Sequence, residues 1–198
     1  MIDQSQVTAC LVTRGDQPDA VERILESLIF DKVALWDNST SGLDWKTAGR
    51  YMAAKRAATD VVYFQDDDVI VPEVTQRALL ASYEPGVMVA NWGHGIDPDG
   101  YDDLPLVCGG AIVDRDLPLQ AMERYLAEQP MDDWFLYDAD FAIGVLYPEF
   151  RHVHLPFEID LAIAQHKSRL CNQPWQREAK RTITERARAI RDRAGVTA

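Results

Sequence analysis

Three consecutive carboxylates are the strongest chemical feature of the sequence. Asp66, Asp67 and Asp68 follow the apolar run VVYF at residues 61–64 after one residue, Gln65, and the run predicts a buried strand. Three like charges at the end of a buried strand are costly to bring together unless a positive group lies between them. Mg²⁺ and Mn²⁺ take one or two protein carboxylates and complete their shell with substrate phosphate and water. We therefore expect Mn2+ or Mg2+ at Asp66 and Asp68, with Asp67 on the opposite side of the extended chain.

A solvated acidic turn before Pro72 is the alternative reading of this cluster. It would need no ligand, and it would leave the three carboxylates in water.

The elements before the acidic cluster alternate between strand and helix patterns. Strand patterns at 7–13, 32–36 and 61–64 are separated by an amphipathic pattern at 20–29 and an alanine-rich, helical segment at 45–58. This β-α-β-α-β order is typical of a doubly wound parallel sheet. Such sheets bind ligands outside the carboxyl ends of their strands, which is where the cluster falls.

The second half predicts a mixed set of elements. We expect helices at 72–82, about 117–128 and 138–146, strands at 87–92, 106–113, 151–155 and 159–164, and a final helix at about 175–193. No repeat or linker divides the chain. The prediction is one α/β domain over 1–198, with a nucleotide-binding half (1–92), a mixed second half (93–174) and a C-terminal basic helix (175–198).

The segments VTACLVTRG, VALWDNSTSG and AAKRAATDVVYFQDDDVIVP resemble the nucleotide-sugar half of GT-A-fold glycosyltransferases, particularly the family 2-like group. The resemblance covers roughly residues 7–175. It implies a Rossmann-like, mostly parallel sheet flanked by helices. It also implies transfer of a sugar from a nucleotide-diphosphate sugar, UDP-linked by first expectation, to an acceptor hydroxyl with inversion.

The resemblance also implies donor-binding residues. The loop Thr13-Arg14 would hold the base, Asp37 would contact the uridine, and the DxD motif, with Asp67 inside it, would bind the metal and diphosphate. Arg56 and the stretch 167–169 are further candidates for the diphosphate, since Arg suits bidentate phosphate contacts.

The resemblance also implies a catalytic base in an acidic pair that opens a helix. Asp140, just before FAIGVL, is the first choice and Asp138 the second, while the pair at 132–133 is another candidate. An Asp at a helix start is also a common capping residue. Gly109 and Gly110 resemble the small-residue strand that faces the acceptor in the family.

The resemblance further implies a late His as third metal ligand. His166, at the end of a strand-like run, is the candidate, and His154 and His152 are its rivals. A His near a sheet edge is more often a surface residue than a ligand.

Charge is distributed unevenly along the chain. The net charge is −12, yet residues 166–198 hold nine basic and three acidic residues. The acidic body excludes binding to nucleic acid by general phosphate attraction. Three interpretations of the basic helix stay open: docking on the acidic body, binding of an anionic acceptor such as hydroxymethylated DNA, and attachment to anionic lipid.

Aromatic residues favour a carbohydrate acceptor. Trp92 and the polar loop at 93–105, together with MDDWFLYD at 131–138, would line the acceptor side. Packing into the core is the other interpretation of Trp134 and Phe135.

The sequence pattern does not predict a targeting signal or a membrane span. The start MIDQSQVTACLV has no basic region and only a short apolar run. Cys10, Cys108 and Cys171 form no CxxC pair. We expect a cytoplasmic protein with reduced cysteines and no integral membrane contact.

Three other functions share part of this pattern. An aspartyl phosphohydrolase carries its DxD on the first strand, and a nucleotidyltransferase needs a glycine-rich basic loop where this chain has TRGDQPD. A non-catalytic nucleotide-sugar or carbohydrate-binding relative is the remaining alternative. Release of nucleoside diphosphate from a nucleotide-sugar would distinguish it from an enzyme.

Overall fold

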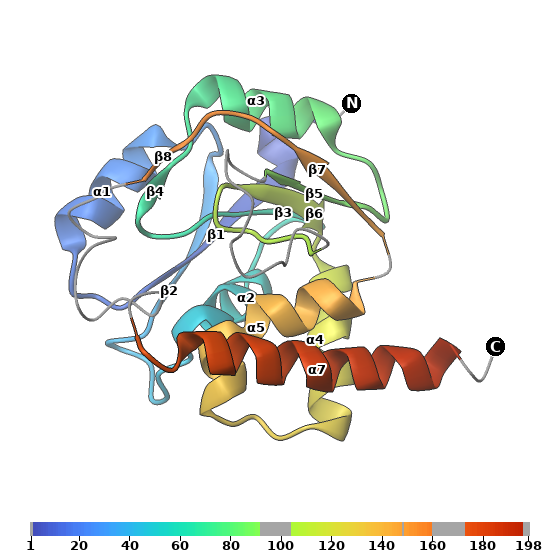
Figure 1. The fold of residues 1–198 in the computed structure, drawn as a ribbon. Coiled ribbons are helices and arrows are strands. Elements are labelled where there is room, and N and C mark those ends of the chain that lie inside the picture. The colour runs from blue at the N-terminus through green and yellow to red at the C-terminus, as the bar shows by residue number, and fades with distance from the viewer. Residues whose placement is uncertain (1, 92–103, 148, 160–172, 196–198) are drawn as a thin grey trace.

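A six-stranded sheet forms the centre of the computed structural model, which describes residues 2–91, 104–147, 149–159 and 173–195 (Figure 1). The strand order is β2-β1-β3-β6-β5-β7. The strands are β1 (Val7–Thr13), β2 (Lys32–Asp37), β3 (Val61–Phe64), β5 (Met88–Asn91), β6 (Ala111–Asp114) and β7 (Phe150–Val153). Only β6 runs antiparallel to its neighbours, so the carboxyl ends of the other strands lie at one edge.

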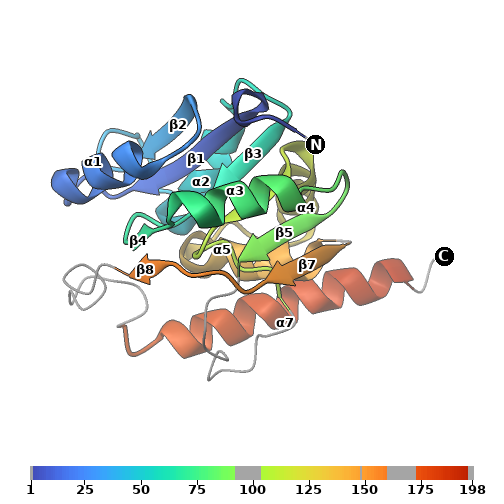
Figure 2. The ribbon, with the colours of Figure 1, turned by 90° about the horizontal axis from the view of Figure 1, so that it is seen from above.

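Helices cover both faces of the sheet (Figures 1 and 2). One face carries α1 (Pro18–Ser27) and α3 (Glu73–Ser82), and the other carries α2 (Gly49–Ala54), α4 (Asp116–Glu128), α5 (Asp133–Leu146) and α7 (Gln176–Gly195). Side chains of β1 point alternately to the two faces of the sheet. Val7 and Ala9 belong to the core beneath α3, while Cys10 and Val12 belong to the larger core beneath α2 and α5. The predicted α/β class is confirmed.

Three boundaries differ from the sequence prediction. The strand predicted at 106–113 begins only at Ala111, because Gly110 has φ +100° and a Cβ on Gly109 would lie 2.7 Å from the Asn91 carbonyl oxygen. The helix predicted at 138–146 begins earlier, at Asp133. Segment 45–58 forms a 3-10 turn, η2 (Lys46–Ala48), and the short α2.

The sequence patterns did not predict the second, two-stranded sheet. It pairs β4 (Val69–Ile70) with β8 (Glu158–Ile159), two strands too short for a periodic pattern. The rest of the strand expected at 159–164, Trp92 and the loop up to residue 103 lie outside the described residues.

The C-terminal helix docks on the body. Its apolar stripe is buried against α5 and α4 through Ala179, Ile183, Thr184, Ala187 and Ile190, although Ala194 is exposed. Arg186 pairs with Asp132, and Arg193 with Glu128. Part of the basic charge of the tail therefore balances the acidic body. No helix within the described ranges has the length and apolarity to cross a bilayer.

Ile183 tests this docking. Its side chain is fully buried between helices, so Ile183→Ala should lower the free energy of unfolding by about 2–5 kcal/mol in urea denaturation. Arg181→Ala, on the exposed side of the same helix, should change it by less than about 0.5 kcal/mol. Equal stability of the two variants would contradict the docking.

Candidate active site

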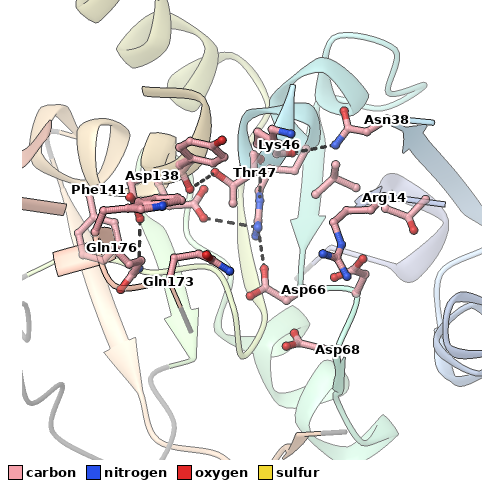
Figure 3. A pocket seen from close by; sticks show the side chains of 17 residues that line it. Arg14, Asn38, Lys46, Thr47, Asp66, Asp68, Asp138, Phe141, Gln173 and Gln176 are labelled. Atoms are coloured by element: carbon pink, nitrogen blue, oxygen red, sulfur yellow. Dashed lines mark hydrogen bonds and ion pairs between the residues drawn. The ribbon is translucent and has the colours of Figure 1, made fainter. Parts of the chain in front are cut away.

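A cavity of about 620 Å³ lies at the carboxyl edge of the sheet (Figure 3). One wall comes from the sheet and its loops, and the other from α5 and the start of α7. The sheet wall holds Thr13, Arg14, Asn38, Asp66, Asp67 and Asp68, and the helical wall holds Tyr137, Asp138, Asp140, Phe141, Gln173, Trp175 and Gln176. Arg50 lies between the two walls, paired with Asp66 on the first and with Asp140 on the second.

The acidic cluster is fixed by the turn after β3. Gln65 is fully buried; it accepts a hydrogen bond from the Tyr63 hydroxyl at 2.8 Å and donates one to the Val69 carbonyl at 2.9 Å. The Asp66 amide donates to the Cys108 carbonyl at 3.3 Å. These bonds hold both ends of the turn, so the carboxylates between them are presented at the sheet edge.

Arg50 is the positive group between the carboxylates. It is 3% exposed, and its Nη2 lies 2.6 Å from Asp66 Oδ1 and 3.5 Å from Asp140 Oδ2. Burial lowers the pKa of Arg50, but the two carboxylates outweigh burial and raise that pKa above its ordinary value. Among the described residues, its Nη1 has no hydrogen-bond partner although it is buried at the cavity.

Asp140 has a partner on each carboxylate oxygen. The Tyr51 hydroxyl donates to Oδ1 at 2.6 Å, and Arg50 approaches Oδ2. Burial raises the pKa of Asp140, and Arg50 opposes that rise. This carboxylate is therefore held in a fixed network.

Asp138 lies where α5 breaks. Its backbone is non-helical, with φ −131° and ψ 35°. The Thr47 hydroxyl lies within hydrogen-bond distance of two carbonyl oxygens at the break, 3.1 Å from that of Leu136 and 3.0 Å from that of Tyr137. Gln176 Nε2 donates to Asp138 Oδ1 at 3.4 Å, whereas Oδ2 is buried with no hydrogen-bond partner in the described chain.

Burial raises the pKa of Asp138 to about 7, while Lys180 lowers it and Asp140 raises it further. A carboxylate with one unpartnered oxygen and a pKa near neutrality is suited to accept a proton. The two acids expected here differ in their surroundings: both oxygens of Asp140 have partners, whereas one oxygen of Asp138 has none in the described chain.

Most residues expected at the donor side line the cavity, but two do not. Thr13, Arg14 and the acidic cluster line it, as do both Asp138 and Asp140. Asp37 instead closes a turn, accepting hydrogen bonds from the Ser39 amide and hydroxyl at 2.8 and 2.6 Å, and its neighbour Asn38 faces the cavity.

Arg56 lies away from the cavity. Its guanidinium stacks 4.3 Å from the centroid of the Trp36 ring, whereas Arg50, six residues earlier, lines the cavity. Asp132 also lies elsewhere: it caps α5 by accepting from the Phe135 amide and pairs with Arg186.

The third metal ligand stays a prediction. His166 lies outside the described residues, with the stretch 167–169. His152 Nε2 is 2.9 Å from the Leu104 carbonyl oxygen, and neither His152 nor His154 lines the cavity. Within the described ranges, no three His, Cys, Asp or Glu side chains converge to hold a metal ion.

Sequence reasoning missed Thr47, Arg50, Tyr51, Trp175 and Gln176. Arg50 and Tyr51 interrupt the small residues of the segment TAGRYMAA, and a polar pair in a segment that packs tightly was the available signal. Trp175 and Gln176 carry no local signal, because their role depends on how α7 docks.

No protein-family model and no curated protein matches this sequence. Among solved structures, the chain is similar to a glycosyltransferase involved in glycosylation of the major capsid of PBCV-1, with a TM-score of 0.51 and 12% identity over 75% of this chain and 81% of that one. The chain has a GT-A-like fold.

Weaker similarities include two other structures. Residues 1–349 of S. aureus TarS in complex with UDP align over 90% of this chain and 69% of that one, with a TM-score of 0.47 and 12% identity. A 4-diphosphocytidyl-2C-methyl-D-erythritol synthase from Anaerococcus prevotii aligns over 92% of this chain and 98% of that one, with a TM-score of 0.47 and 14% identity.

Removal of the Arg50 charge tests the network. Arg50→Met would leave Asp66 and Asp140 without their cation, so the free energy of unfolding should fall by about 3–5 kcal/mol in urea denaturation. Adding Asp66→Asn to Arg50→Met should recover part of that loss. Arg56→Met, at an exposed arginine that stacks on Trp36, should cost about 1 kcal/mol or less. Similar losses at both arginines would contradict the bridge.

Proposed function

We propose that this protein is a metal-dependent glycosyltransferase. It moves a sugar from a nucleotide-diphosphate sugar, with UDP-sugars as the expected donors, to an acceptor hydroxyl with inversion. One observation carries the proposal: the acidic motif after β3 and Asp138, which has a buried and unpartnered oxygen, line opposite walls of one cavity. The fold it shares with a solved glycosyltransferase supports this reading.

The donor would lie on the sheet wall. Thr13 and Arg14 end β1 beside the cavity, where a nucleoside could contact them, and Asp67 lines the same wall. Arg50 offers Nη1 to a diphosphate, since a guanidinium donor without a partner favours a phosphate oxygen. In this proposal Arg50 takes the part expected of Arg56.

A metal ion fits this wall only together with its substrate. Two carboxylates, Asp66 and Asp68, line the cavity, and Asp66 already has Arg50 as a cationic partner. Two carboxylates plus phosphate oxygens and water are a common Mg²⁺ or Mn²⁺ shell, whereas a site made of protein alone needs more ligands. Asp68 and Asp66 would hold the ion, which when bound stabilises the charge of the departing diphosphate.

Asp138 would act on the acceptor. An acceptor hydroxyl oxygen attacks the anomeric carbon from the side opposite the diphosphate, and the carbon–oxygen bond to the diphosphate breaks. The bonding electron pair leaves with the nucleoside diphosphate, and the hydroxyl proton passes to Asp138 Oδ2. A single displacement of this kind inverts the anomeric centre. Asp140, held by Tyr51 and Arg50, would position the helical wall.

A panel of nucleotide-sugars tests the proposal. With Mn²⁺ and a mixture of acceptors, at least one donor should release nucleoside diphosphate, and Asp68→Asn should abolish the metal-stimulated part. Asp60→Asn, an exposed acid just before β3, is the matched control and should retain the activity. Donor binding without release would identify a binding protein, and full turnover by Asp68→Asn would remove the metal role.

The pH dependence tests the base. Asp138 must be ionised to accept a proton, so kcat/KM should rise with pH along a limb near pH 7, following its raised pKa of about 7. Asp138→Asn should lower turnover by about 10²–10⁴-fold and leave donor affinity nearly unchanged. A rate limb that persists unchanged in Asp138→Asn would assign the titration to another group.

The same pKa shift predicts an effect on stability. Because the folded-state pKa of Asp138 lies above the unfolded value of 3.8, the folded protein binds more protons between about pH 4 and 7. Ionisation of Asp138 therefore lowers stability as pH rises through that window, and Asp138→Asn should lack this loss in urea denaturation at pH 5 and pH 8. An unchanged pH dependence in the variant would contradict the raised pKa.

A further inference from the structure

An aromatic cluster forms part of the helical wall. The rings of Tyr137 and Trp175 have centroids 4.6 Å apart, and Trp134 packs edge-on against Trp175 at 5.9 Å. Tyr137 and Trp175 line the cavity and are only partly buried, unlike Phe141 beside them. Two neighbouring rings hold the Trp175 indole in place, so it presents a fixed apolar surface to the cavity.

Both segments that contribute to this surface also bring it close to Asp138. Tyr137 directly precedes Asp138, and Trp175 directly precedes Gln176, whose amide donates to Asp138. A ring stacked on the indole would therefore lie close to the carboxylate with the unpartnered oxygen. The wall joins an apolar platform to a group that can accept a proton from a hydroxyl.

The charges on this side of the cavity favour a neutral ligand. Among the described lining residues, the wall from α5 and α7 contributes carboxylates, amides and aromatic rings but no Lys or Arg. The basic lining residues belong to the other segments, and each has an acidic partner: Arg14 with Asp16, Lys46 with Asp44, and Arg50 with Asp66. Lys46 Nζ also lies 5.7 Å from the centroid of the Tyr137 ring, against which Trp175 packs. An anionic acceptor would meet Asp138 and Asp140, whose cationic neighbours, Lys180 and Arg50, already act on these carboxylates.

We propose that Trp175 and Tyr137 form the acceptor subsite and that its ligand is a pyranose ring of a neutral carbohydrate. The inference rests on the proposed glycosyl transfer and adds the acceptor class. Sugar C–H groups pack on an aromatic face while the hydroxyls at the ring edge remain free to form hydrogen bonds. One such hydroxyl would reach Asp138 Oδ2.

The subsite gives the C-terminal helix a role beyond docking. Trp175 lies just before α7, and Gln176 is the first residue of α7. The later turns of the helix are anchored by the buried Ile183 and Ile190. The acceptor side of the cavity is therefore incomplete without this helix.

Saturation-transfer difference NMR tests the subsite without requiring turnover. Neutral methyl pyranosides should receive saturation from the parent protein, and their 6-phosphate counterparts should receive much less. Trp175→Ala should lose the signal, Trp175→Phe should keep most of it because a flat ring remains, and Arg181→Ala should match the parent. Circular dichroism melts of the same samples verify that the variants are folded.

The outcomes separate this inference from the proposed function. Pyranoside binding that depends on Trp175, without release of nucleoside diphosphate from any donor, would uphold the subsite and contradict the transferase. If transfer occurs, Trp175→Ala should raise the acceptor KM at least tenfold and change the donor KM less than twofold. Absence of pyranoside signals in the parent, preference for the phosphorylated sugars, or equal signals in the parent and folded Trp175→Ala would overturn the inference.

Discussion

A buried guanidinium between two carboxylates is the constraint on which the site depends. Arg50 is almost inaccessible to water, and a charge in that position must be compensated within the protein. Asp66 and Asp140 supply the compensation from the end of β3 and from α5. The two walls of the cavity are therefore joined electrostatically, and neither can move far without exposing an uncompensated charge.

One short segment organises this arrangement. Within η2 and α2, Thr47 binds the carbonyls freed at the break in α5, Arg50 bridges the walls, and Tyr51 holds Asp140. The break places Asp138 out of helical geometry, with one oxygen unpartnered. The two aspartates of α5 therefore differ: Asp140 has a partner on each oxygen, while burial raises the pKa of Asp138 to about 7.

The strong periodic patterns in the sequence predicted much of the fold. The strands at 7–13 and 61–64 and the position of the acidic cluster at the sheet edge follow from local apolar runs. The contribution of Arg50 did not follow, because its burial depends on two carboxylates far away in the sequence. The late start of β6 depends on the close approach of Gly109 to Asn91, which no local pattern encodes.

The central claim is that one cavity binds the donor between Arg50 and the acidic motif. A crystal structure with Mn²⁺ and the nucleoside diphosphate of an accepted donor tests it most directly. An anomalous manganese peak is expected at Asp68 and Asp66, with the diphosphate between that ion and Arg50. A nucleotide bound outside the cavity, or manganese away from both carboxylates, would contradict it.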